Sequence, residues 1–549
     1  LKRFYEIKEL QQDGLHSWNI EKRDLLIELP SQKDFITNNE SISNLQKLNL
    51  DALDAIDETT FSDLMNVLKR ANDRIKPKNE VRPLIVEFLT LKVFDEKRSK
   101  KNKSFLKFYI LDDEKKSNGL AENSFRERIM SLYENAKNEY GNVLTKPLFS
   151  YSNNKGKLKP SDSNDEKFLI ALVEIFQRRA ILKAKNESFN QIIFNNFGDE
   201  KQKADKGQFF TPIPIVKNII KILNPIKGEE LCDPCCGICD FPAMAFKHAY
   251  RNEAEFPDNA SHFYGFDLES GNLKLAELNL VLNGDGGATL RSMDSLAQKL
   301  LENGEVLNYG DFTRSNYDIE DWEPIEDDNK KLKKYDIIAT NPPFGKGRDL
   351  ATGKNGKWDL SKETLDLYET YYNKLDVDKK GNKKLPKSMD MGALFLENAY
   401  KLLKDGGRMG IVLSNSIASI KEWENIRKWF IKRMRIVAII DLPPNTFGET
   451  GVATTVIIAY KPKVGDESLL DKNYEIFIKE IDNIGYEVKT VKRSIVFKPI
   501  FRFDENTLER TNVLEEDFTN MQIDFTEFLK RQEEEVKMAF GLEGRKESE

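Results

Sequence analysis

Seven short apolar runs alternate with helical segments between residues 229 and 462, and this alternation constrains the fold more than any other feature. The runs are ELCDP, HFYGFDL, ATLRSMD, YDIIATN, GRMGIVLSN, RIVAIIDLP and TTVIIAYKP. Apolar residues at 272–282 and 392–403 follow helical spacing. An order of strand, helix, strand is typical of an α/β fold whose mostly parallel sheet is covered on both faces. The last two runs are close together, which predicts an antiparallel pair.

The chain has 549 residues, and domains usually hold roughly 100–200 residues, so we expect more than one domain. Before the alternating region, apolar residues follow helical spacing at 60–71, 81–96 and 168–184. After residue 501 the sequence is again helical in pattern and highly charged. We therefore predict three parts, namely a mostly helical N-terminal domain over 1–205, a seven-stranded α/β domain over 206–465 and a helical C-terminal extension over 466–549.

Hydropathy and charge exclude some classes of protein. No stretch reaches the roughly 18 consecutive apolar residues of a membrane helix. The first residues, LKRFYEIKEL, lack the apolar core of a signal peptide, so we expect a cytoplasmic protein with no membrane contact. The net charge of −6 is unusual for a chain that grips DNA alone, because Lys and Arg make the phosphate contacts. Either a locally basic face or a partner would then supply those contacts.

All four cysteines fall within eight residues, at Cys232, Cys235, Cys236 and Cys239, which raises the question of a zinc site. Structural zinc sites usually join two knuckles separated by a longer stretch. Here one turn, stiffened by Pro234, would have to surround the ion, whereas small cysteines pack well in a buried turn. The three histidines are far apart in sequence, which disfavours a His-based site. We expect packing and no bound metal.

Acidic residues stand where three of the expected strands end. Asp233 and Pro234 end the first strand and precede Gly237, which lets the backbone pass close to a ligand. Asp267 ends the second, where a carboxylate can accept hydrogen bonds from both hydroxyls of a ribose. Asp294 ends the third and is placed to meet an adenine amino group. These positions predict a nucleoside cofactor, although an ordinary turn with two surface acids would look similar. No GxxxxGKS segment is present, which disfavours ATP.

The fourth run leads directly into Asn341-Pro342-Pro343-Phe344. An aromatic amine such as adenine N6 is a poor nucleophile, because its lone pair is delocalised into the ring. The Asn341 side-chain oxygen and the Pro342 carbonyl can accept hydrogen bonds from that amine, and two prolines fix both acceptors in advance. Phe344 can stack on a base that has been flipped out of a duplex. The alternative is a proline-rich turn that simply closes a strand.

The chain resembles the N6-adenine DNA methyltransferases, and among them the modification (M) subunits of type I restriction-modification systems. NPPF is similar to the catalytic motif of that family, and the segments at 393–417 and 438–462 are similar to this subfamily. The resemblance covers about 60–465 and is strongest over 206–462. It implies a Rossmann-like S-adenosylmethionine-dependent methyltransferase sheet and transfer of a methyl group to N6 of a flipped-out adenine in a specific DNA sequence.

The segment GQFFTP at 207–212 resembles the part of the family that covers the methionine end of S-adenosylmethionine. The resemblance therefore implies a cofactor site made of Gln208, Phe209, Phe210, Thr211, Pro212, Asp233, Pro234, Gly237, Asp267 and Asp294. In the family the loop typically reads Asp-Pro-x-x-Gly-x-Gly-Gly-Phe, and here Cys239 and Asp240 replace the second and third glycines. We expect the Cβ of Cys239 to crowd the cofactor. Asp267 replaces the more usual Glu and keeps the carboxylate.

The resemblance also implies partners, because M subunits act on double-stranded DNA with a separate specificity (S) subunit and a restriction (R) subunit. Only about a hundred residues follow LPPNTF, and a base-reading module usually needs about 100–150 residues of its own. The N-terminal helices and the C-terminal extension are the expected docking elements. Two other functions stay open: a DNA-binding scaffold whose altered loop no longer holds the cofactor, and a methyltransferase of RNA or of protein glutamine.

Overall fold

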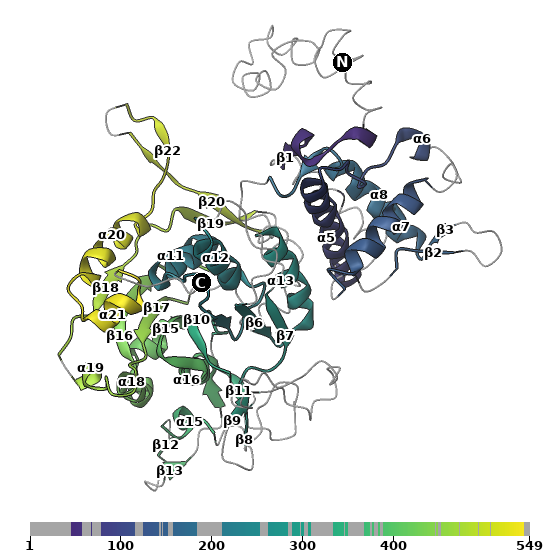
Figure 1. The fold of residues 1–549 in the computed structure, drawn as a ribbon. Coiled ribbons are helices and arrows are strands. Elements are labelled where there is room, and N and C mark those ends of the chain that lie inside the picture. Colours follow the sequence, from purple (N-terminus) through teal and green to yellow (C-terminus); the bar gives the residue numbers. More distant parts are fainter. Residues whose placement is uncertain are drawn as a thin grey trace. The chain divides into compact units, whose positions relative to one another are not determined.

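A computed structural model of the chain (Figure 1) divides into two compact units, residues 1–75 with 90–184 and residues 76–89 with 185–549. The residues that it describes are 45–56, 67, 78–115, 124–141, 144, 147–151, 158–183, 211–252, 262–283, 288–296, 298–300, 306–308, 333–344, 346–349, 367–373, 376–377, 383–384, 388–444, 446–447, 452–471, 473–491, 494–504 and 507–542. Within those residues, no helix is both long and apolar enough to cross a lipid bilayer.

The first unit is mostly helical, as the sequence predicts. Its elements are η1 (Leu45–Lys47), η2 (Leu50–Ala52), β1 (Asp54–Ala55), most of α5 (Lys78–Asn102), α6 (Asp112–Lys115), α7 (Ser124–Lys137), β2 (Phe149–Tyr151), β3 (Leu158–Pro160), α8 (Ser163–Phe176) and β4 (Arg179–Ala180). The helix expected at 81–96 lies within α5, and α8 ends before residue 184. The helix expected at 60–71 lies almost wholly outside the described residues.

A buried carboxylate joins α5 to the end of this unit. Lys92 and Glu96 form an ion pair at 3.3 Å with both side chains fully buried. Glu96 also accepts hydrogen bonds from the backbone N–H groups of Ile181 and Leu182, at 3.0 and 2.8 Å. Because a buried carboxylate is stable only when it is paired and hydrogen-bonded, these contacts fix the segment at 181–182 against the helix.

The second unit is built on an eight-stranded sheet with the order β18-β16-β17-β15-β10-β5-β6-β7. Its strands are β5 (Leu231–Asp233), β6 (Phe263–Asp267), β7 (Thr289–Ser292), β10 (Tyr335–Thr340), β15 (Leu403–Ser414), β16 (Arg435–Leu442), β17 (Thr454–Tyr460) and β18 (Phe477–Glu480). All seven apolar runs form strands of this sheet, which confirms the predicted α/β fold. The expected antiparallel pair is β16 and β17, with Ile439 opposite Ile457.

Helices cover both faces of the sheet (Figure 1). One face packs against α11 (Ile213–Leu223), α12 (Asp240–Ala249), α13 (Ser270–Leu282), α20 (Phe518–Leu529) and α21 (Glu534–Ala539). The other packs against α15 (Glu369–Asn373), α16 (Met391–Leu402) and α18 (Glu424–Ile431). Successive strand residues point to opposite faces, so Ile337 joins the first core and Ile338 the second. Burial on both faces explains why the strands are near-continuous apolar runs.

Smaller elements complete the unit. They are β8 (Gln298–Leu300), β9 (Val306–Asn308), β11 (Lys346–Asp349), β12 (Asp376–Val377), β13 (Lys383–Lys384), β14 (Ser388–Asp390), α17 (Asn415–Ser419), η5 (Lys421–Trp423), α19 (Ser468–Asp471), β19 (Tyr486–Val491), β20 (Ser494–Pro499), β21 (Phe501–Phe503) and β22 (Arg510–Leu514). The strands β19 to β22 form two successive antiparallel hairpin pairs.

The C-terminal segment differs from the helical extension expected over 466–549. It adds β18 to the sheet edge, then the two hairpin pairs, and only then α20 and α21. The apolar side of α20, with Met521, Phe525 and Phe528, is buried in the core of the sheet rather than presented outward. Arg435 on β16, 1% exposed as a side chain, pairs with Glu533 at 2.5 Å and so anchors the segment before α21. The four-residue β18 alternates half-buried and exposed side chains, a pattern too short to be recognised in sequence.

Candidate active site

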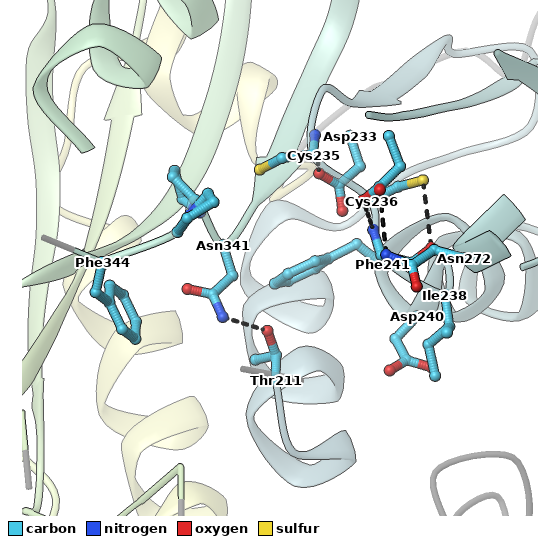
Figure 2. Close-up of a pocket in the computed structure, with 14 residues that line it drawn as sticks. Thr211, Asp233, Cys235, Cys236, Ile238, Asp240, Phe241, Asn272, Asn341 and Phe344 are labelled. Carbon is cyan, nitrogen blue, oxygen red and sulfur yellow. Dashed lines mark hydrogen bonds between the residues drawn. The ribbon is translucent and has the colours of Figure 1, made fainter. Parts of the chain in front are cut away.

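The candidate site lies where the strand order of the sheet reverses. From β5 the chain passes to β6 and β7 on one side and then returns to β10 on the other. All four strands are parallel, so their carboxyl ends meet at one edge, which is where open α/β sheets bind ligands. A pocket of about 650 Å³, counting its open mouth, lies there (Figure 2). It is lined by Thr211, Asp233, Cys235, Cys236, Gly237, Ile238, Asp240, Phe241, Asp267, Asn272, Asn341, Pro342, Pro343 and Phe344.

The turn between β5 and α12 is held against the end of β6 by backbone hydrogen bonds. Cys236 N–H donates to the Phe266 carbonyl at 2.8 Å, and Gly237 N–H donates to Asp267 Oδ2 at 2.9 Å. Gly237 has a φ of 55° and Cys239 a φ of 61°, both in the left-handed region. The turn can therefore reverse sharply and start α12 directly beneath the pocket.

Two buried carboxylates define the electrostatics of the pocket. Asp233 is 2% exposed and accepts hydrogen bonds from Thr340 Oγ1 at 2.6 Å and Cys235 N–H at 3.1 Å. Burial raises the pKa of Asp233 to about 7, and neighbouring acids add to the shift. Burial likewise raises the pKa of Asp267, which is 8% exposed, to about 6. A cationic ligand with hydroxyl groups would relieve both carboxylates.

Asp267 already has most of its acceptor positions filled. Its Oδ1 accepts from Glu269 N–H at 2.8 Å and Asn272 Nδ2 at 3.1 Å, and its Oδ2 accepts from Gly237 N–H. A carboxylate offers about four acceptor positions, so these contacts leave room for one more strong bond, on Oδ2. That Asp267 accepts hydrogen bonds from ribose hydroxyls stays a prediction, and the acceptor position that these contacts leave is on Oδ2.

The turn after β10 brings Asn341 into the same pocket. Its Nδ2 donates to Thr211 Oγ1 at 2.9 Å, and Figure 2 shows the carboxamide oxygen directed away from that threonine. Pro342 and Pro343 follow and also line the pocket. Phe344 packs edge to face on Phe447, with ring centroids 5.4 Å apart. The Asn341 amide and the Phe344 ring therefore both line this pocket.

Most of the expected site residues that the structure describes meet in this pocket. Those that line it are Thr211, Asp233, Gly237, Asp267, Asn341, Pro342, Pro343 and Phe344. Pro212, Pro234 and Asp294 do not line it. Pro212 is the N-cap of α11, Pro234 follows β5 in the turn, and Asp294 is buried with its Oδ1 accepting from Leu296 N–H at 3.2 Å. Gln208, Phe209 and Phe210 lie outside the described residues.

Six lining residues were not among the expected site residues, namely Cys235, Cys236, Ile238, Asp240, Phe241 and Asn272. Ile238, Asp240 and Phe241 continue the turn past Gly237, and Asn272 lies in the first turn of α13. Their nearness in sequence to Gly237 and Asp267 could have identified them. A helix that begins at a strand end places its first residues at the edge of the sheet where ligands bind. Phe447 was missed as well, since its contact with Phe344 joins positions about a hundred residues apart.

The cysteines pack on different sides of the sheet. Cys232 belongs to the core that contains α16, whereas Cys236 and Cys239 belong to the core that contains α12. The sulfur of Cys235 lies 2.9 Å from Thr340 Oγ1. Burial raises the thiol pKa of all four, which opposes the thiolate that zinc requires. Across the described ranges, no group of three or more His, Cys, Asp or Glu side chains is arranged to hold a metal.

The expectation that Cys239 crowds the cofactor is not met, because Cys239 is fully buried and does not line the pocket. Its side chain lies against Gly265 on β6, where an added Cβ would come within 2.4 Å of the sulfur. Asp240, in contrast, does line the pocket. Its Oδ1 accepts from Asn279 Nδ2 at 2.8 Å, and its place in the first turn of α12 favours a negative charge.

Comparison with known proteins gives a family match. The profile of the N-6 DNA Methylase family matches residues 189–513, which is more than half of the chain. The Type I restriction enzyme EcoKI methylase subunit of Escherichia coli (strain K12) is 26% identical over 281 residues, which cover 49% of this chain and 43% of the relative. The Type II methyltransferase M.VspI of Vibrio sp. (strain 343) is 28% identical over 251 residues, covering 45% of this chain and 47% of the relative.

Among solved structures, the type I restriction-modification system methyltransferase subunit from Streptococcus thermophilus is 16% identical, with a TM-score of 0.48. That alignment covers 87% of this chain and 94% of the other. The chain spans less than half the length of the two curated relatives described above.

The contact between Cys239 and Gly265 gives a test of the loop. We expect Gly265→Ala to lower the free energy of unfolding by about 1–3 kcal/mol, because the new methyl group would lie 2.4 Å from the Cys239 sulfur and 3.0 Å from the Cys236 sulfur. Adding Cys239→Gly should restore much of that loss, since it removes the overlapping atom. Urea denaturation of both single variants and the double variant measures the coupling. Additive losses would mean that the two residues do not share one packing site.

Proposed function

The chain belongs to the N-6 DNA Methylase family, and from that premise we propose that it transfers a methyl group from S-adenosylmethionine to N6 of a flipped-out adenine in double-stranded DNA. One observation carries the proposal. Asn341 and two prolines form a stiff turn in the lining of a pocket that also contains buried carboxylates, at the reversal point of the sheet. That arrangement joins a fixed hydrogen-bond acceptor to a site for a cationic nucleoside.

The lining residues have the chemistry that this cofactor needs. Asp267 has one acceptor position for a ribose hydroxyl, on Oδ2. Asp233 and Asp240 give the pocket the negative charge that suits a positively charged ligand, and Ile238 and Phe241 supply apolar surface for an adenine ring. When bound, S-adenosylmethionine supplies a methyl group on a positively charged sulfur. Pro212, Pro234 and Asp294 are proposed to support this site without lining the pocket. Gln208, Phe209 and Phe210, which are outside the described residues, stay proposed cofactor residues because of the resemblance.

The NPPF turn is proposed to prepare the amine for attack. The Asn341 Oδ1 and the Pro342 carbonyl accept hydrogen bonds from the two protons of the adenine amino group. These hydrogen bonds favour a tetrahedral amino nitrogen, whose lone pair is no longer delocalised into the ring. They also stabilise the positive charge that develops on the nitrogen during transfer. Phe344, which packs against Phe447, stacks on the flipped base. This contact replaces the stacking that the base loses when it leaves the duplex. The proton that the amino group loses after transfer would pass to solvent, because the Asn341 and Pro342 oxygens accept hydrogen bonds but are too weakly basic to take it up.

We further propose that the chain is the modification subunit of a type I restriction-modification complex and works with a specificity subunit and a restriction subunit in the cytoplasm. The net charge of −6 supports a partner that carries much of the DNA contact. Several relatives are named as type I methylase subunits. Because α20 buries its apolar side in its own unit, the helical N-terminal unit is the better docking element of the two that were expected.

A stand-alone methyltransferase is the second candidate, because one relative of similar identity is named as a type II methyltransferase. The impaired-scaffold alternative rested on both replaced glycines of the loop; it loses the support of Cys239, which does not line the pocket, whereas Asp240 does line it. Methylation of RNA or protein glutamine is less favoured because the matching family is one of DNA methylases.

Replacing the catalytic amide tests the proposed chemistry. We expect Asn341→Ala to lower the rate of methyl transfer to DNA on the order of 100- to 1,000-fold, because it removes a fixed acceptor at the reacting nitrogen. Cofactor affinity, measured by calorimetry, should stay nearly unchanged, since the contact acts mainly in the transition state. The exposed Asn473, changed to Ala, is the matched control. Near-normal transfer by Asn341→Ala would remove this residue from the mechanism.

The raised pKa values of the pocket acids predict pH-dependent cofactor binding. With pKa values of about 7 for Asp233 and about 6 for Asp267, both acids lose protons between pH 5.5 and 8. A cationic ligand favours the ionised forms, so S-adenosylmethionine should bind on the order of 10-fold more tightly at pH 7.5 than at pH 5.5. The empty protein should show the opposite trend, because a folded-state pKa above the unfolded value of 3.8 means that stability falls as pH rises.

Calorimetric titration across this pH range checks the prediction, with Asp233→Asn as the variant that should flatten the part of the curve near pH 7. Affinity that is constant or falls with rising pH would show that the acids do not face the cofactor.

DNA binding by the isolated chain separates the two candidate functions. A modification subunit without its specificity subunit should bind duplexes weakly and without sequence preference at physiological salt, because the specificity subunit would make the contacts to the base edges. Fluorescence titration against several duplexes, with and without the specificity subunit, measures this. Tight and sequence-selective binding by the chain alone would favour the stand-alone methyltransferase.

A further inference from the structure

The proposed chemistry requires that the carboxamide of Asn341 face the substrate with its oxygen. A carboxamide has nearly the same shape when its oxygen and nitrogen exchange places, so packing alone hardly selects the orientation. A hydrogen-bond partner on one side does select it. If the group turned by 180°, an N–H group would oppose the adenine amino group, and two donors would face each other.

The structure provides such a partner in Thr211. Asn341 Nδ2 donates to Thr211 Oγ1 at 2.9 Å, and the oxygen is directed to the other side (Figure 2). The two residues are 130 positions apart, and both line the pocket. Their meeting therefore depends on the fold and not on a local turn.

Thr211 is held firmly enough to act as a reference point. It is 6% exposed and directly precedes Pro212, the N-cap of α11, whose carbonyl accepts hydrogen bonds from the N–H groups of Ile215 and Val216. The buried side of α11 packs into the core beneath the sheet. Threonine is branched at Cβ, so its χ1 angle is restricted and its hydroxyl stays in place.

We propose that Thr211 is a positioning residue for methyl transfer, which fixes the Asn341 amide with its oxygen toward the substrate amine. This inference rests on the proposed function. Thr211 acts through Asn341. Removing its hydroxyl should therefore lower the rate of transfer in saturated enzyme, and only while the Asn341 amide is present. A threonine that only packs, or that only contacts the cofactor, would instead change stability or cofactor affinity.

The test measures the single-turnover rate of methyl transfer at saturating S-adenosylmethionine and DNA, with the chain joined to its specificity subunit. The variants are T211V, which keeps the shape and removes the hydroxyl, T211S, N341A and the double variant T211V/N341A. T90V is the matched control, because Thr90 is a fully buried threonine of the other unit. Thermal melts check that each variant folds, and T211A replaces T211V if the valine variant does not.

We expect T211V to lower the transfer rate about 10-fold, as for loss of one aligned hydrogen bond. T211S should restore most of the rate, T90V should match the unchanged protein, and adding T211V to N341A should have no further effect. Normal transfer by T211V, or an equal loss with and without the Asn341 amide, would overturn the positioning role. If the unchanged protein methylated no adenine, the proposed function itself would fail, which is a separate outcome from a normal rate in T211V.

Discussion

The hydrogen bond from Gly237 N–H to Asp267 Oδ2 joins the turn after β5 to the tip of β6, and the geometry of the pocket depends on it. It orients the Asp267 carboxylate at the end of β6 and fixes the backbone of the turn that follows the neighbouring strand β5. The adjacent bond from Cys236 N–H to the Phe266 carbonyl keeps the turn in register with β6. Since α12 begins within this turn, the same bonds place Asp240 and Phe241 on the pocket wall.

This arrangement buries acidic groups, and their ionisation inside the protein is unfavourable. Asp233 and Asp267 are buried near each other, and both have pKa values raised by burial. Such a cluster destabilises the empty protein at neutral pH and is relieved by a positively charged ligand, which is a common compromise between stability and function. Asn341 carries no charge and directly follows Thr340, whose hydroxyl donates to Asp233 at 2.6 Å. In the proposed mechanism, the acceptor for the substrate amine is therefore a neutral group close to the buried acids of the same pocket.

Much of the fold could be predicted because strands buried on both faces leave strong apolar runs, and the seven runs all became strands. The site followed from topology, since acids at the tips of parallel strands meet at one edge. What could not be predicted depended on contacts distant in sequence. Thr211 and Asn341 are 130 positions apart, and β18 and the terminal hairpins carry too little periodicity to be recognised. Cys239 was misjudged because its left-handed backbone turns the side chain toward Gly265.

The central claim is that this pocket methylates an exocyclic amine of adenine in DNA. The most direct measurement supplies the chain and its specificity subunit with duplex DNA and methyl-labelled S-adenosylmethionine, digests the DNA to nucleosides and identifies the labelled product by mass spectrometry. The account predicts label in N6-methyl-2′-deoxyadenosine and in no other nucleoside. Label in a methylated cytosine, or label found only in RNA or protein offered in the same reaction, would contradict it.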